Sequence, residues 1–181
     1  IGGVADDAIL TTEGQSVTFV YVDATEGWKN IQDSTSNVMG NAYIVATGGT
    51  ITTCGNDKIH KFTGPGTFAV TAVHPCATYN LVSYMVTAGG GGGSGGPSGD
   101  GGGAGGAGGF RELVSPTAPY SASPLNGYPT PGNRITVSAT PYPITVGGGG
   151  SGTSAFQTAG GNGNPSVFSS ITSTAGGGGG G

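Results

Sequence analysis

Two cysteines and two histidines carry the strongest metal-binding chemistry in this chain. Cys54, His60, His74 and Cys76 follow one another with the spacing C-x5-H-x13-H-x-C. Structural zinc sites usually take their ligands in close pairs such as C-x2-C or H-x3-H, which this pattern lacks. We therefore expect no metal site and place both histidines on hairpin faces. One disulfide between the cysteines is geometrically feasible, and the alternative is two free buried cysteines, which are the commoner case.

The other reactive residues do not indicate an enzyme or a nucleotide cofactor. The nine acidic residues lie mostly at predicted turns, and no serine sits in a nucleophile-elbow motif. Strings of the form GxGxxG occur in the glycine tracts, but no helix follows them and no Gly-Lys-Ser/Thr motif is present. We expect a protein with no catalytic residue and no cofactor. A rival hypothesis, a depolymerase, predicts a groove lined by paired carboxylates.

A proline- and tyrosine-rich segment, Arg111–Arg134, carries the residues best suited to binding. It contains five prolines, and Tyr120 and Tyr128 lie among small polar residues. Proline limits the entropy lost on binding, and tyrosine offers a large contact area at low entropic cost. We expect Tyr120 and Tyr128 to bind a partner, with Arg111 at the rim of this loop. The alternative is that both tyrosines fold back and cover the glycine tracts.

The segments on either side of this loop are rich in glycine, and the composition of the chain indicates whether they are ordered. Glycine accounts for 41 of the 181 residues, hydrophobic residues for 34% and charged residues for 8%. Disordered segments usually carry high net charge and few apolar residues, so the composition favours ordered glycine tracts over a flexible linker. Five basic residues and a net charge of −4 predict no nucleic-acid partner. No apolar stretch approaches the roughly 20 residues that cross a bilayer, so we expect no membrane-spanning segment.

The longest glycine tract, Gly89–Gly109, has a repeat of three residues. All of its non-glycine residues except Ser98 are spaced three apart with one slip of a single residue: Ser94, Pro97, Asp100, then Ala104, Ala107 and, just beyond, Phe110. Three residues per turn is the repeat of the polyproline II helix, which makes no internal hydrogen bonds. Because buried backbone groups need partners, we expect a lattice in which this tract pairs with two further runs, Gly147–Gly150 and Gly176–Gly181.

Strand-like segments lead directly into the glycine runs. SYMVTA precedes Gly89, PITV precedes Gly147, and SVFSSITSTA precedes Gly176. Two hairpins are predicted upstream from their turn residues. One joins Ala42–Thr47 to Thr50–Thr53 through Gly48-Gly49, and the other spans Lys58–Val73 with its turn at Gly64-Pro65-Gly66.

The first strand-like run, Ser16–Val22, is apolar on both of its faces. A turn at Glu26-Gly27 follows, and then Trp28. So short a segment cannot cover both faces alone, and exposed apolar patches mark interfaces. We expect this region to pack against other copies, around a threefold axis, with Trp28 near the contact.

These elements together predict an all-β fold in which short β-strands and hairpins feed a polyglycine II sandwich, with no significant α-helix. Residues 1–37 would be a β-fibre-like entry segment, residues 38–88 a hairpin-rich β region, and residues 89–181 a glycine-rich polyglycine II region with the proline and tyrosine loop at 111–134. Because the chain starts at Ile1 and ends in glycines, we expect a fragment or processed product that continues past Gly181.

Six segments stand out along the chain: VTFVYVDATEGW at Val17–Trp28, the segment Tyr43–Val70 with its FTGPGTF turn, VSYMVTAGGGGGSGG, GGAGGFRE, PYPITVGGGGSG and SVFSSITSTAGGGGGG. These segments resemble the glycine-rich domain of bacteriophage tail-fibre and receptor-binding (adhesin) proteins. The resemblance implies an extracellular virion component, often a trimer, that presents loops to a host-cell glycan or protein. It implies no catalytic residue.

A second interpretation is a bacterial extracellular filament or surface-adhesion subunit whose copies pair through glycine strands. Copies repeated along a helical axis would favour this filament. A closed trimer at the end of a fibre would favour the virion component.

Overall fold

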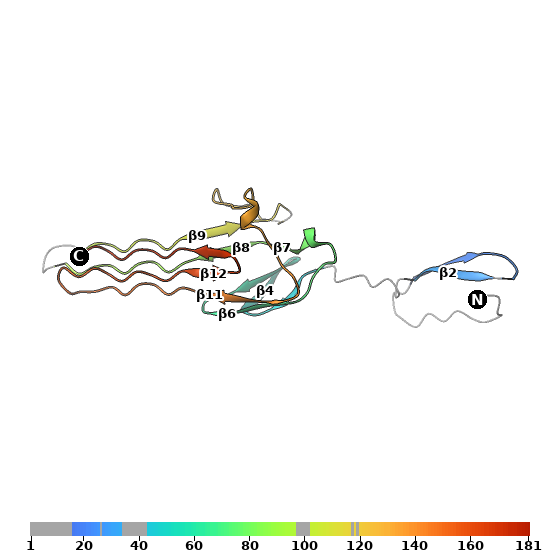
Figure 1. Cartoon of the computed structure of the whole chain (residues 1–181), viewed down its shortest axis with the longest axis horizontal. Coiled ribbons are helices and arrows are strands. Elements are labelled where there is room, and N and C mark those ends of the chain that lie inside the picture. The colour runs from blue at the N-terminus through green and yellow to red at the C-terminus, as the bar shows by residue number, and fades with distance from the viewer. Residues whose placement is uncertain (1–15, 26, 34–42, 97–101, 117, 119) are drawn as a thin grey trace. The chain divides into compact units, whose positions relative to one another are not determined.

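The structure is a computed structural model that describes residues 16–25, 27–33, 43–96, 102–116, 118 and 120–181. These residues form short β-strands and two short 3₁₀-helices, and none of them lies in an α-helix (Figure 1). The expected all-β class is therefore confirmed. The chain divides into two compact units, Ile1–Gly40 and Asn41–Gly181.

The first unit contains one antiparallel hairpin of β1 (Val17–Tyr21) and β2 (Trp28–Asp33). In its turn the Asp23 carboxylate accepts a hydrogen bond from the Thr25 N–H at 2.8 Å, and Gly27 has a φ of +68°. The rings of Tyr21 and Trp28 meet edge to face with centroids 5.4 Å apart. The sequence predicted this strand and the turn after it correctly, whereas the expected contact of Trp28 with other copies stays a prediction.

A long, interrupted hairpin opens the second unit. β3 (Val45–Thr47) pairs with β6 (Gly66–Ala72), and β4 (Thr50–Cys54) pairs with β5 (Asp57–Lys61). The chain therefore reverses once, between β4 and β5, where Gly55 has a φ of +59°.

The hairpin turns predicted at Gly48-Gly49 and at Gly64–Gly66 are wrong. Gly48 and Gly49 have φ values of +107° and +65°, and a Cβ on either would lie within 2.7 Å of a carbonyl oxygen of the opposite arm. These glycines bend one arm where it passes close to the other, in the manner of a bulge. The Gly48-Gly49 pair correctly indicated a backbone with positive φ. Such a conformation occurs within one arm of a hairpin as well as at the turn between the arms.

The main sheet has five strands in the order β13–β12–β11–β6–β3. β11 (Pro141–Thr145) pairs with β6 and with β12 (Ser166–Phe168), which pairs with β13 (Ile171–Ser173). The Phe168 ring lies 6.0–6.3 Å, between centroids, from three other aromatic rings. Burial of this apolar surface is the hydrophobic contribution to folding. The buried cluster consists of Ala46, Phe68, Val70, Ile135, Val137, Phe168 and Ile171.

Two smaller antiparallel pairs flank this sheet. β7 (Leu81–Val82) pairs with β10 (Ile135–Thr136), and β8 (Tyr84–Thr87) pairs with β9 (Phe110–Leu113). The 3₁₀-helices η1 (Ala77–Asn80) and η2 (Pro131–Asn133) precede β7 and β10.

Five glycine-rich strands extend side by side from the ends of these β-strands (Figure 1). We name them g1 (88–96), g2 (102–109), g3 (147–153), g4 (159–165) and g5 (174–181). Strands g1, g3 and g5 continue β8, β11 and β13, whereas g2 and g4 return into β9 and β12. The three predicted junctions of β-strand and glycine run are confirmed, and two further junctions exist.

Strand g1 is hydrogen-bonded to all four other glycine strands, and its partner changes with a period of three. The N–H groups of residues 88, 91 and 94 donate to g2, and those of residues 89 and 92 donate to g4. The carbonyl oxygens of residues 89 and 92 accept from g5, and those of residues 90 and 93 accept from g3. All nine bonds measure 2.8–3.1 Å. This threefold alternation is the polyglycine II pattern that the sequence predicted.

The remaining bonds arrange the five strands in two layers. Strand g5 bonds g2 and g4, and g4 bonds g3, whereas no described bond joins g2 to g3. Strands g2, g1 and g3 therefore form one layer, and g5 and g4 lie over it in the grooves on either side of g1. We refer to this arrangement as the glycine sandwich.

Inside the sandwich, glycine is required because it has no side chain. A Cβ at Gly91 would lie 1.9 Å from the Gly177 carbonyl oxygen, and one at Gly150 would lie 2.0 Å from that of Gly161. No described glycine of these five strands has a positive φ, so conformational freedom is not the reason. Rows that point outward are different: Gly148 has nothing within 4 Å of its Cβ position, and Ala104 is exposed.

The expected number of glycine strands is wrong. We predicted one strand over Gly89–Gly109 and three strands in all, but this tract folds back on itself to form g1 and g2. Strand g4 was missed because its segment, AGGNGNP, contains no long glycine run. Pro97 and Asp100 of the expected repeat lie outside the described residues.

Among the described residues, the structure has no helix long and apolar enough to cross a membrane.

The sandwich predicts opposite effects for two substitutions in g3. Gly150→Ala forces a methyl group onto the Gly161 backbone, and we expect the free energy of unfolding to fall by about 3 kcal/mol, as for severe overpacking. Gly148→Ala meets open space, and we expect it to raise that free energy by about 0.5 kcal/mol by restricting the unfolded chain. Urea denaturation measures both. Equal effects of the two substitutions would contradict the close-packed lattice.

Candidate functional site

The proline- and tyrosine-rich loop is built on the end of β9. Leu113 is fully buried and Val114 is 5% exposed, so the chain is anchored in the core where the loop begins. The Ser115 N–H then donates to the Ser83 hydroxyl at 3.0 Å. At the other end Ile135, also buried, enters β10. Both ends of the loop are thus fixed by buried residues.

Asn126 is the main internal anchor of the loop. Its Oδ1 accepts the N–H of Val114 at 3.0 Å and the N–H of Tyr128 at 3.1 Å, and its Nδ2 donates to the Val114 carbonyl at 3.4 Å. The neighbouring Gly127 N–H donates to the Glu112 carbonyl at 2.9 Å. One amide side chain therefore ties the middle of the loop to β9.

Glu112 holds a second point of the loop. Its Oε2 accepts the Ser123 N–H at 2.9 Å and the Ser123 hydroxyl. The negatively charged Glu112 carboxylate is therefore hydrogen-bonded to another residue of the same loop. A carboxylate that accepts two hydrogen bonds is an effective anchor, since bonds to charged groups are stronger than neutral ones.

Tyr128 is half-buried and is held by Arg134. The Arg134 guanidinium lies 4.3 Å from the centroid of the Tyr128 ring, and its Nε donates to the Tyr128 carbonyl at 3.0 Å. The Tyr84 hydroxyl supports the same region by donating to the Asn133 carbonyl at 2.7 Å. Burial raises the pKa of the Tyr84 phenol above its ordinary value, and the nearby positive charge of Arg111 acts in the opposite direction.

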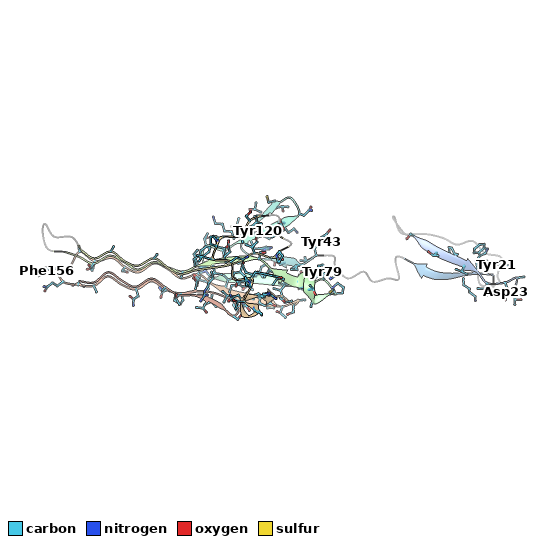
Figure 2. The ribbon with its side chains drawn as sticks, turned by 90° about the horizontal axis from the view of Figure 1, so that it is seen from above. Tyr21, Asp23, Tyr43, Tyr79, Tyr120 and Phe156 are labelled. Atoms are coloured by element: carbon cyan, nitrogen blue, oxygen red, sulfur yellow. The ribbon has the colours of Figure 1, made fainter. Side chains whose placement is uncertain are left out.

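The predicted binding residues are placed differently from one another. Tyr120 is 53% exposed on the loop and points outward (Figure 2). Arg111 is exposed on β9. Trp28 is 54% exposed, but it belongs to the first unit and is described with that unit alone.

The cysteines and histidines form no described metal cluster. Both cysteines are free and exposed, so neither the disulfide nor the buried position is correct. His60 lies on β5, where its ring packs edge to face on Phe68 and its Nδ1 donates to the Gly48 carbonyl at 2.8 Å. His74 follows β6 instead of lying on a hairpin face.

His74 belongs to a compact turn before η1. Its Nδ1 accepts the Cys76 N–H at 2.9 Å, and its ring packs on Tyr79 with centroids 4.7 Å apart. The buried Asn80 side chain bonds both the N–H and the carbonyl of His74, each at 2.8 Å. Both histidines are therefore structural residues here.

Sequence reasoning missed the polar residues that make the loop rigid. Asn126, Glu112 and Arg134 carried no motif, because their partners are backbone groups brought near by the fold. The Asn126-Gly127 pair was the available signal, since Asn-Gly marks a tight turn. Leu125, which is 68% exposed beside it, adds an apolar side chain to the outer surface of the loop.

A comparison with protein families adds one match. A family model described as a glycine-rich domain matches residues 61–181, about two thirds of the chain. No curated protein and no solved structure matches the chain.

The loop predicts that Asn126→Ala destabilises the protein by about 2 kcal/mol, because the buried N–H of Val114 loses its acceptor. Leu125→Ala is the matched control: it removes an exposed side chain and should change the free energy of unfolding by less than about 0.5 kcal/mol. Thermal unfolding and hydrogen exchange over residues 111–134 measure the two effects. Unchanged exchange in Asn126→Ala would show that the loop is held by other contacts.

Proposed function

The chain belongs to the glycine-rich domain family, and we propose that it is a structural, adhesive part of an extracellular fibre, a phage tail fibre. In this proposal the glycine sandwich is a rigid body, and the loop at 111–134 contacts a glycan or protein on the host-cell surface. The proposal assigns no catalytic step and no cofactor.

The observation that supports this proposal most is an exposed aromatic residue on a loop whose two ends and middle are held by buried residues and hydrogen bonds. Tyr120 is 53% exposed while the surrounding loop is held by Asn126, Glu112 and Arg134. A loop already fixed in place loses little entropy when it binds, so exposed side chains on it are suited to recognition. Tyrosine is among the residues that dominate binding energies at interfaces.

The resemblance of the sequence to tail-fibre and adhesin proteins provides the biological setting. The VSYMVTAGGGGG junction and the FTGPGTF segment carry that resemblance. A body whose inner rows are glycine offers few side chains to a partner, which leaves the loops and the β region as the contact surfaces (Figure 2).

Binding to cells is tested with the labelled protein on a panel of bacterial strains, with lipopolysaccharide and outer-membrane protein fractions as separate probes. We expect Tyr120→Ala to weaken binding at least tenfold, about 1.4 kcal/mol, without changing the melting temperature. Tyr43→Ala is the control, because Tyr43 is 78% exposed and lies outside the loop. An equal loss in both variants, or no binding to any strain or probe, would contradict the proposal.

We also propose that copies of the chain associate through the hairpin of β1 and β2, as a trimer in preference to a helical filament. Trp28, Tyr21 and Val20 are 54%, 52% and 43% exposed, so this small hairpin leaves a large share of its apolar surface uncovered. Exposed apolar surface of this kind favours association.

Light scattering tests this association. We expect Trp28→Ala to lower the mass of the particle, because the largest exposed side chain of the hairpin is lost, whereas Tyr43→Ala should leave the mass unchanged. A wild-type monomer whose Trp28 fluorescence is that of a fully solvated indole would refute the interface. A mass that grows steadily with concentration would identify a filament in place of a trimer.

A further inference from the structure

The interrupted hairpin of β3 to β6 borders an open pocket of about 300 Å³. Between its two paired parts, one arm contributes only Gly48 and Gly49, whereas the other arm contributes the seven residues 62–68. Residues 48–50 and 61–67 line the pocket. The pocket is therefore a consequence of the unequal lengths of the two arms.

Phe62 supplies the aromatic part of the pocket lining. Three glycines border its ring: a Cβ at Gly48, Gly49 or Gly66 would lie 3.4, 3.2 or 3.1 Å from a carbon atom of the ring. Phe62 is partly buried and packs against the buried cluster of the sheet, so the ring is held in place. Because glycine has no side chain, the space beside the ring is left open.

The arm that contains Gly48 is held from the side of the core. Thr50 and Lys61 lie directly opposite each other across β4 and β5, so their side chains share one face of this pair. His60 is on the other face, where its ring packs on Phe68 and its Nδ1 donates to the Gly48 carbonyl at 2.8 Å. Contacts within the chain thus fix this wall of the pocket without a ligand.

The polar part of the pocket carries one positive charge. Lys61 is the one charged residue that lines it, and Asp57, the one acidic residue of strands β3 to β6, lies at the opposite end of β5. The pocket is locally positive although the chain has a net charge of −4. Three exposed threonines, Thr50, Thr63 and Thr67, add hydroxyl groups that can each donate one hydrogen bond and accept two.

We propose that this pocket binds a sugar ring that carries a carboxylate, as in the uronic acid units of acidic polysaccharides. The weakly positive C–H groups on one side of a sugar ring complement the negative face of an aromatic ring, here that of Phe62. The threonine hydroxyls and the glycine backbone complement the sugar hydroxyls, and the Lys61 ammonium pairs with the carboxylate. A volume of about 300 Å³ is at the small end of the range for ligand pockets, which suits a single sugar unit.

Titration of the isotopically labelled full chain with methyl β-D-glucuronide, followed by nuclear magnetic resonance, tests the site. Methyl β-D-glucoside is the matched neutral sugar. We expect amide signals of residues 48–50 and 61–67 to shift, and the glucuronide to bind about fivefold more tightly than the glucoside, as one exposed ion pair allows. The absence of shifts at these residues, or equal affinities for the two sugars, would overturn the proposal.

Two lysine variants assign the charge. Lys61→Gln should lower the affinity for the glucuronide about fivefold, to that for the glucoside. Lys58→Gln is the matched control, because Lys58 is an exposed lysine of the same strand that does not line the pocket, and it should change neither affinity. Equal effects of the two substitutions would overturn the assignment of the site.

Two further variants separate this pocket from the loop at 111–134. Phe62→Leu keeps an apolar side chain but removes the aromatic ring, and we expect both sugars to bind about tenfold more weakly at an unchanged fold, verified by circular dichroism. Tyr120→Ala should bind both sugars as the wild type does, because the pocket contains no residue of that loop. Loss of sugar binding in Tyr120→Ala would overturn the proposal. If Phe62→Leu does not fold, the two lysine variants decide.

Discussion

The structure depends on the need of glycine backbone to find hydrogen-bond partners sideways. A polyproline II strand makes no internal hydrogen bonds, so every N–H and carbonyl that leaves water needs a neighbour. The neighbours come close enough only where no Cβ intervenes, since a Cβ at Gly91 would lie 1.9 Å from the Gly177 carbonyl oxygen. Glycine content, strand number and layer arrangement all follow from this single requirement.

The β region and the glycine sandwich depend on each other. The sandwich buries almost no apolar side chain, so hydrophobic burial is concentrated around Phe68 and Phe168 in the sheet. Each glycine strand is joined directly to a β-strand, which fixes its position and direction and lowers the entropy lost when the lattice forms. At one junction the Ser166 hydroxyl accepts the Gly147 N–H at 2.9 Å, where the sheet pattern changes to the lattice pattern.

The sequence predicted the class of the fold better than its connections. The period of three is present in the structure: Ala104 and Ala107 are exposed on an outward row of g2, whereas a Cβ at Gly105 would lie 2.1 Å from the Gly91 carbonyl oxygen. The slip of one residue after Asp100 lies between g1 and g2 and was the available sign that the tract reverses. Strand g4 was hidden because Asn162 interrupts its glycines, although Asn162 fills the outward row. The loop was recognised by composition, but its rigidity comes from bonds to backbone that no local pattern encodes.

The same constraint determines where this protein can carry chemical information. A side chain on an inward row would separate strands, so inner positions admit only glycine. Outward rows, the loop at 111–134 and the turn around Phe156, which is 60% exposed, can vary without breaking a lattice bond (Figure 2). Variable side chains are therefore confined to the outward rows, the loops and the β region. The absence of side chains that lets the glycine strands pack closely thus also restricts which parts of the surface can vary in sequence.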